Sequence, residues 1–77
     1  MHVEIITPDE TYFDGEAESV KVPGASGSFE ILNLHAPIIS ALSSGKIEVK
    51  VKDEDPKFFE IQQGFIECQN NKIVILV

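Results

Sequence analysis

The sequence predicts an all-β fold, a small antiparallel β-sandwich or flattened barrel of about nine to ten strands. Two observations predict this class. Apolar and polar residues alternate with a period of two, which is typical of strands with one buried face, and turn-forming residues recur about every 8 to 12 residues, as they do in sandwiches and barrels. No stretch has the period of a helix. The 77 residues are enough for a single domain, residues 1–77.

The first half of the chain contains two alternating stretches and a glycine turn. Val3 and Ile5 alternate with polar neighbours, and Val20 and Val22 do the same. Each stretch is predicted to be a half-buried strand. Residues 24–27 are predicted to reverse the chain, because they lead into another strand, whereas a phosphate-binding glycine loop leads into a helix.

The second half ends in a predicted hairpin. Residues 47–51 alternate strictly and give the clearest strand. Asn70 and Asn71 separate two apolar stretches, residues 64–69 and 72–77, and Asn tolerates the positive φ that tight hairpin turns require. Both sets of alternate residues in 72–77 are apolar, so this strand is expected to be covered on both faces.

The bulky core candidates are the five phenylalanines. Adjacent residues of a strand point to opposite faces, so one of the two neighbouring phenylalanines lies at a sheet interface or is covered by something else. The five are Phe13, Phe29, Phe58, Phe59 and Phe65.

The net charge of −7 bounds the kind of partner. Residues 1–38 hold seven acidic residues against Lys21 alone, so nucleic acid and anionic lipid are not expected as ligands, because both need a cationic surface. A basic protein partner is compatible with this charge. No signal peptide is expected, because the first residues do not include a basic segment followed by a long apolar one. The longest apolar run, residues 73–77, is too short to span a bilayer, so no direct lipid insertion is expected.

Residues suited to catalysis or metal binding are few. His2, His35 and Cys68 are not spaced as metal ligands, and residues 53–55 lack the glycine and distal glutamate of a calcium loop. No catalytic, cofactor-binding or metal-binding residue is expected. Cys68 is predicted to be a small buried hydrophobe. One alternative is a biotinyl or lipoyl carrier domain, which presents a modified lysine at a hairpin tip; Lys72 fits that role best.

Seven segments, in order, resemble one family. The chain is similar to the N-terminal β-sandwich domain of the epsilon subunit of F-type ATP synthases, which corresponds to the mitochondrial delta subunit. The segments are Val3–Pro8, Phe13-Asp14-Gly15-Glu16, Val20-Lys21-Val22-Pro23-Gly24, Gly27-Ser28-Phe29, Ile31-Leu32, His35-Ala36-Pro37-Ile38 and Gln63-Gly64-Phe65-Ile66-Glu67.

The resemblance implies a non-catalytic subunit of the rotor stalk. Such a subunit lies at the cytoplasmic face of the bacterial plasma membrane, binds the gamma subunit and rests on the c ring, and so helps to couple proton or sodium translocation to ATP synthesis. The residues that the resemblance implies for the c ring are Ser26, Gly27, Ser28, Phe29, Asn33, Leu34, His35, Ala36 and Pro37. Those that it implies for gamma are Ile38, Ser40 and Leu42.

Two departures from the family pattern affect these expectations. The family usually has Pro-Gly before His-Ala-Pro, and this chain has Asn33 and Leu34. The family commonly continues into a C-terminal helical hairpin that can bind ATP, and this sequence stops at Val77, so no small-molecule ligand and no cofactor are expected.

Physical arguments support a role for the loop before Ile38. Pro37 disfavours helix at Ala36 and keeps the chain extended, and a preformed loop loses less entropy when it docks. The acidic first half of the chain could complement basic c-ring loops. Two alternatives stay open: His35 is either a structural residue or a contact, and alternation in the segment that contains Leu34 and Ile38 buries some apolar residues and exposes others.

Overall fold

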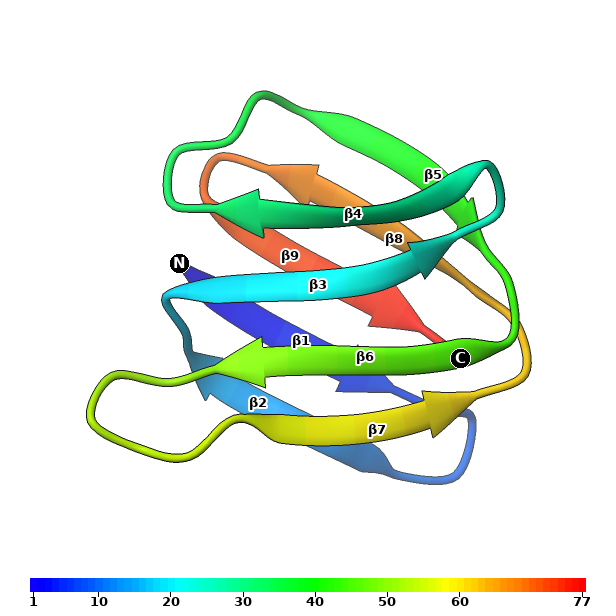
Figure 1. The fold of residues 1–77 in the computed structure, drawn as a ribbon, viewed down its shortest axis with the longest axis horizontal. Helices are drawn as coiled ribbons and strands as arrows, with labels where there is room; N and C mark the ends of the chain where they lie inside the picture. The colour runs from blue at the N-terminus through cyan, green and yellow to red at the C-terminus, as the bar shows by residue number, and fades with distance from the viewer.

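Nine β-strands and their connections form the computed structural model, which describes residues 1–77 (Figure 1). No helix is present, so the predicted all-β class is confirmed. None of its elements is a helix that could cross a membrane. The strands are β1 His2–Ile6, β2 Thr11–Glu16, β3 Ser19–Gly24, β4 Gly27–Leu32, β5 Ile38–Leu42, β6 Gly45–Lys50, β7 Lys57–Ile61, β8 Gly64–Gln69 and β9 Lys72–Leu76.

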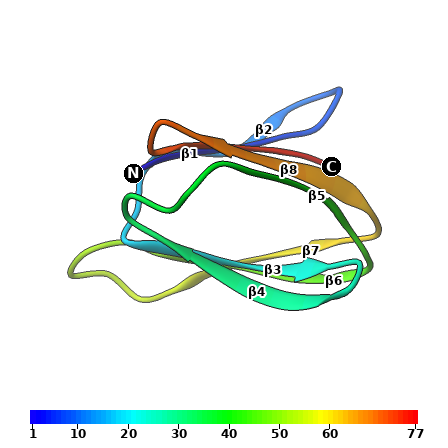
Figure 2. The same cartoon turned by 90° about the horizontal axis from the view of Figure 1, so that it is seen from above.

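The strands form one sheet that curls into a nearly closed barrel. Their order is β2-β1-β9-β8-β5-β3-β6-β7, with β4 paired to β3. Figure 2 shows two layers, with β1, β2, β5, β8 and β9 in one and β3, β4, β6 and β7 in the other. The sheet passes between the layers where β3 meets β5, through the single pair Gly24–Leu42. The barrel is therefore a flattened sandwich that is joined along one side.

One strand pair is parallel in an otherwise antiparallel sheet. β1 runs parallel to β9, in a register from His2–Lys72 to Ile6–Leu76. Alternation indicates which residues form strands, but it carries no information about the direction of a partner that is distant in sequence. The predicted antiparallel sandwich therefore holds for every pair except this one.

Isoleucine and valine fill the space between the layers. Their branched side chains pack well on pleated surfaces. The largest fully buried side chains are Ile5, Ile31, Ile47, Ile66, Ile73, Ile75, Val3, Val20, Val22 and Val49. The expected aromatic core is found in part, because Phe13, Phe29 and Phe59 are partly buried and pack against the core, whereas Phe58 and Phe65 are exposed. Alternation places the two exposed rings on the outer faces of β7 and β8.

The last strand has one covered face. Ile73 and Ile75 are fully buried, whereas Val74 is half-buried and Leu76 is 52% exposed. The expectation that both faces are covered is therefore wrong. The hairpin before β9 is confirmed, since Asn70 and Asn71 have φ values of 52° and 59° and connect the paired residues Gln69 and Lys72.

Aromatic rings join the two end strands of the sheet, β2 and β7. Phe59 of β7 stacks on Tyr12 of β2, with ring centroids 6.1 Å apart, and meets Phe13 edge-on at 6.3 Å. Such contacts add stabilisation beyond the apolar area that they bury. The barrel thus closes here through side chains, because β2 and β7 do not pair through their backbones.

Candidate functional site

The loop Asn33–Pro37, called the contact loop below, connects β4 to β5 at one end of the barrel (Figure 1). All five of its residues are exposed. Leu34 is the most exposed large apolar residue of the chain, at 83%, and it has a φ of 64°. Residues other than glycine rarely adopt this left-handed backbone conformation, and those that do are often found at functional sites.

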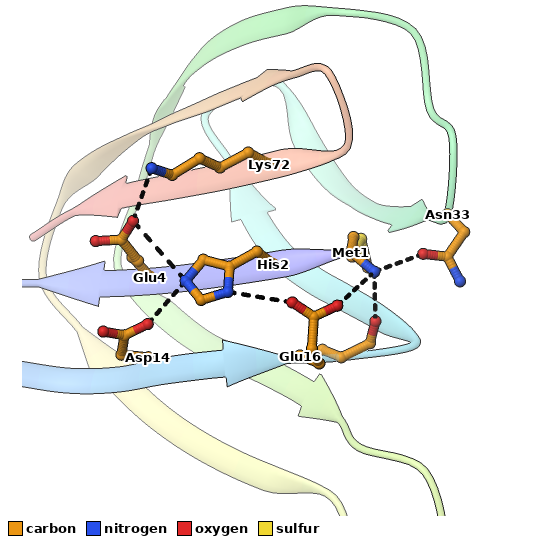
Figure 3. Close-up of polar contacts among 8 residues, drawn as sticks. Met1, His2, Glu4, Asp14, Glu16, Asn33 and Lys72 are labelled. Atoms are coloured by element: carbon orange, nitrogen blue, oxygen red, sulfur yellow. Dashed lines mark hydrogen bonds and ion pairs between the residues drawn. The ribbon is translucent and has the colours of Figure 1, made fainter.

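Hydrogen bonds from distant segments hold the contact loop. Asn33 Oδ1 accepts from the N-terminal nitrogen of Met1 at 2.7 Å (Figure 3), and the Leu34 N–H donates to Asn71 Oδ1 at 2.8 Å. Within the loop, the His35 N–H donates to the Leu32 carbonyl at 3.3 Å. His35 Nδ1 also lies 2.6 Å from the Ala36 carbonyl oxygen, which can only accept, so Nδ1 is the donor. The loop therefore has a defined conformation and exposes its apolar side chain.

The turn between β3 and β4 carries the other residues that the resemblance implies for the c ring. Ser26, Gly27 and Ser28 are exposed, but Phe29 packs against the core. Gly24 and Gly27 pair across the turn, and a Cβ at Gly24 would lie 2.5 Å from the Gly27 carbonyl oxygen. Glycine is therefore required at position 24, and the side chain of Phe29 mainly serves packing.

The contact loop and the β3–β4 turn lie at opposite ends of β4. This strand has six residues, so its ends are roughly 17 Å apart at the usual rise of a strand. β4 pairs with β3 alone, so its other edge is unpaired. Any single surface that includes both segments must run along this edge, where Leu32 is also exposed.

The residues that the resemblance implies for gamma face the interior of the barrel, unlike those of the contact loop. Leu42 is 4% exposed and belongs to the core, Ile38 packs against the core, and Ser40 is half-buried. These three side chains point inward, because they are alternate residues of one strand. The outward residues of β5 are Ile39 and Ala41. Leu42 is therefore not available to a partner, and a partner on the outer face of β5 meets the alternate set.

The outward residues of β5 continue into an apolar face on β8 and β9. Ile39 is 74% exposed and Phe65 is 60% exposed. Ala41 pairs with Phe65, and Phe65 pairs with Leu76. A shallow depression of about 250 Å³ lies among these side chains. The apolar face is defined by Ile39, Ala41, Phe65, Val74 and Leu76.

Sequence reasoning missed a charged cluster around His2. His2 Nε2 lies 2.8 Å from Asp14 Oδ1, and Nδ1 lies 3.2 Å from Glu16 Oε2 (Figure 3). Lys72 Nζ lies 3.2 Å from Glu4 Oε1 on the same outer face. The pairing of β1 with β2 and β9 brings these residues together, and only that pairing could have revealed the cluster.

The acidic residues of the first half lie mostly away from the contact loop. Six of the seven fall within residues 4–18, on β1, β2 and the segments beside them, and Glu30 alone is on β4. Glu30 is also within 3.9 Å of Lys50. Of these acids, Glu16 lies beside the loop, because its Oε1 is 3.6 Å from the Met1 nitrogen that also bonds Asn33 (Figure 3). The expected charge complement to basic c-ring loops therefore has Glu16 as its carboxylate beside the loop.

The remaining candidates for chemistry, Cys68 and Lys72, lie where their contacts indicate structural roles. Cys68 is buried, and burial raises the pKa of its thiol. Lys72 lies within β9 and pairs with Glu4, so it is not the isolated tip lysine of a carrier domain. No group of three or more His, Cys, Asp or Glu side chains is arranged to hold a metal ion.

The fold and these surfaces define a class: a small all-β domain that presents a braced loop at one end and an apolar sheet face on one layer. Residues 1–77 match the family model described as the ATP synthase, Delta/Epsilon chain, beta-sandwich domain. The chain therefore belongs to this family. The epsilon chain is a non-catalytic subunit of ATP synthase, which agrees with the expectation that the chain is not an enzyme.

Curated relatives support the family over nearly the whole chain. The ATP synthase epsilon chain of Chlorobium limicola is 40% identical over 74 residues, which are 96% of this chain and 84% of that protein. The epsilon chain of Thermosynechococcus vestitus is 39% identical over 77 residues, which are 100% of this chain. The match spans only 55% of the Thermosynechococcus protein.

Solved structures share the fold. A chain in the central stalk/c-ring structure of the Tetrahymena thermophila mitochondrial ATP synthase has a TM-score of 0.82 at 19% identity, covering 99% of this chain and 61% of that chain. A chain of the Euglena gracilis mitochondrial ATP synthase has a TM-score of 0.90 at 18% identity, covering 97% of this chain and 48% of that chain. At these identities the likeness establishes the fold.

Proposed function

We propose that this chain is a rotor component of the central stalk of an F-type ATP synthase, which links the gamma subunit to the c ring and helps to couple ion translocation to ATP synthesis. The observation that carries the proposal is the contact loop, whose five residues are all exposed while hydrogen bonds fix its backbone. The chain that it resembles in the Tetrahymena enzyme comes from a central stalk/c-ring assembly.

The c-ring contact is proposed along the unpaired edge of β4. The contact loop at one end, Ser26 to Ser28 at the other and Leu32 between them are all exposed. Because the loop is held before any partner arrives, docking loses less conformational entropy. A stiff loop also suits a subunit that transmits rotation, since a flexible contact would yield under load.

The gamma contact is proposed on the apolar face. Four of its five members are exposed and Val74 is half-buried. The face spans β5, β8 and β9, with the carboxylate of Glu67 between Ile39 and Val74. Exposed apolar patches commonly mark surfaces for protein partners. β5 follows the contact loop directly, so the two proposed contacts lie on adjacent parts of the domain. On this proposal the chain is peripheral, at the cytoplasmic face of the bacterial plasma membrane.

Co-purification with separately tagged gamma subunit and assembled c ring tests both contacts. We expect Leu34→Asp to reduce retention by the c ring and Ile39→Asp to reduce retention by gamma. Both side chains are largely exposed, so each variant should keep the free energy of unfolding within about 0.5 kcal/mol of native.

Lys46→Asp is the control, because Lys46 is exposed on β6 and belongs to neither proposed contact surface. This variant should bind both partners as the native chain does. Retention of neither partner by the native chain would overturn the proposal. Native-like retention of the Leu34 variant by the c ring would remove the loop contact, and native-like retention of the Ile39 variant by gamma would remove the proposed gamma face.

A further inference from the structure

We propose that Asn71, in the turn between β8 and β9, is a positioning residue for the contact loop. Its side-chain oxygen holds the backbone of Leu34 in the left-handed conformation that presents the Leu34 side chain. The two residues are 37 positions apart in the sequence. The inference rests on the proposed contact between the loop and the c ring, and it adds a residue that lies outside the loop.

The first observation is the bond itself. The Leu34 N–H donates to Asn71 Oδ1 at 2.8 Å. No backbone carbonyl accepts from this N–H. Leu34 has a φ of 64°, a conformation that a branched, bulky side chain adopts only when its surroundings impose it. The Asn71 side chain supplies that constraint at the residue that needs it.

The second observation is that hydrogen bonds hold the backbone of Asn71 in place. Asn71 is half-buried, and its carbonyl accepts from the His2 N–H at 3.1 Å, so its backbone is tied to the start of β1. The neighbouring pairs of β8 and β9 continue the hydrogen-bonded ladder up to the turn. The sheet, and not the loop, therefore sets the position of Asn71. Its side-chain oxygen can then hold the Leu34 N–H in place.

The third observation is the contrast between the two turn residues. Asn70 and Asn71 both have positive φ, at 52° and 59°, and either Asn or Gly satisfies that requirement. Asn70 is exposed and makes no side-chain hydrogen bond, whereas the Asn71 side chain reaches Leu34. The side chain at position 71 therefore serves more than the geometry of the turn.

Three variants separate these roles. Asn71→Gly keeps the positive φ and removes the acceptor. Asn71→Asp keeps an acceptor oxygen on a side chain that also tolerates this conformation. Asn70→Gly makes the same backbone change at the adjacent position and serves as the matched control. Each is expected to fold, because the turn can form in all three.

Two measurements report on the loop without reference to any partner: amide hydrogen exchange at Leu34, and the intraresidue NOE between its amide and α protons, which is strong when φ is positive. In Asn71→Gly, exchange at Leu34 should rise about five- to tenfold, the ratio expected for the loss of one hydrogen bond, and this NOE should weaken as negative φ values become populated. Asn71→Asp and Asn70→Gly should resemble the native chain in both measurements.

Binding to the assembled c ring completes the test. Asn71→Gly should weaken binding while Asn71→Asp restores it and Asn70→Gly leaves it unchanged. Unchanged exchange and an unchanged intraresidue NOE at Leu34 in Asn71→Gly would overturn the positioning role. Altered exchange with native-like binding would also overturn it, provided that Leu34→Asp does weaken binding. Failure of the proposed function has a different signature, which is native-like c-ring binding by Leu34→Asp itself.

Discussion

Leu34 occupies a backbone conformation that suits glycine better than leucine. At a φ of 64° the Cβ crowds the backbone, which costs about 1–2 kcal/mol for residues other than glycine. Glycine removes this cost but loses about 0.5–1 kcal/mol through the greater freedom of the unfolded chain. We expect Leu34→Gly to raise the free energy of unfolding by about 0.5 kcal/mol, measured by urea denaturation.

Leu32→Gly is the control for this change. Leu32 is also exposed, but it lies in β4 and its φ is not positive. Glycine there should lower the free energy of unfolding by about 0.5–1 kcal/mol. Equal losses for the two variants would contradict the argument that Leu34 is strained.

Cys68 makes stability depend on alkaline pH. Burial raises the pKa of the folded thiol, while the unfolded thiol ionises near pH 8.5. Below about pH 8.5 both states carry the proton and the contribution to stability is complete. As pH rises from there towards the folded pKa, only the unfolded state loses its proton, so the free energy of unfolding should fall.

Urea denaturation of the native chain and of Cys68→Ala between pH 7 and 10 measures this effect. All other residues are common to the two proteins, so their effect on stability cancels in the difference. The native chain should be the more stable below pH 8, and the gap should narrow above it. A gap that stays constant across the range would show that Cys68 ionises equally in both states.

At the scale of elements, substitutions in β7 test how the end strands of the sheet are joined. Phe59 contacts Tyr12 and Phe13 of β2, whereas its neighbour Phe58 points outward and is 57% exposed. Phe59→Ala should lower the free energy of unfolding by about 2–3 kcal/mol, less than a fully buried ring would cost. Phe58→Ala should change it by less than about 0.5 kcal/mol. Thermal or urea unfolding distinguishes the two, and similar losses would mean that the ring contacts do not join these strands.

Alternation predicted the strands well because each strand buries one face. The stretches that contain Val3, Val20 and Val49 and the turn at Asn70 and Asn71 all appear where the sequence placed them. Alternation failed where the question was which face meets which neighbour. The outward set of β5 and the exposed Leu76 of β9 depend on the curvature of the whole sheet, and a period of two does not encode that curvature.

The candidate site was predictable as a segment but not as a structure. Its position before Ile38 follows from the resemblance, and its exposure agrees with the expected loop. The bonds that hold it come from Met1 and Asn71, which are distant in sequence and near only after β1 and β9 pair. Side chains that converge through long-range pairing leave no local pattern to detect.

At the scale of the whole molecule, β9 is the central strand of its layer. It pairs with β1 on one side and β8 on the other, and it contributes Ile73 and Ile75 to the core. Deleting residues 72–77 should leave the chain unfolded, because two ladders and part of a thin core are lost together. Deleting Val77 alone removes one hydrogen bond to Ile6 and one partly buried side chain that packs against the core, and it should cost about 1–2 kcal/mol. Circular dichroism and NMR dispersion separate a folded product from an unfolded one.

The parallel pair of β1 and β9 also sets the order of events during synthesis. β1 is the first strand to leave the ribosome, and its parallel partner is the last of the nine. Until β9 has emerged, β1 and β2 form a hairpin with an unpaired edge and an open apolar face, and such species tend to aggregate. Pairing across so long a stretch of chain is also slow, because the chain loses the entropy of loop closure before the stabilising contacts form. The edge of β1 that pairs with β9 therefore stays without its partner until the last strand has been synthesised.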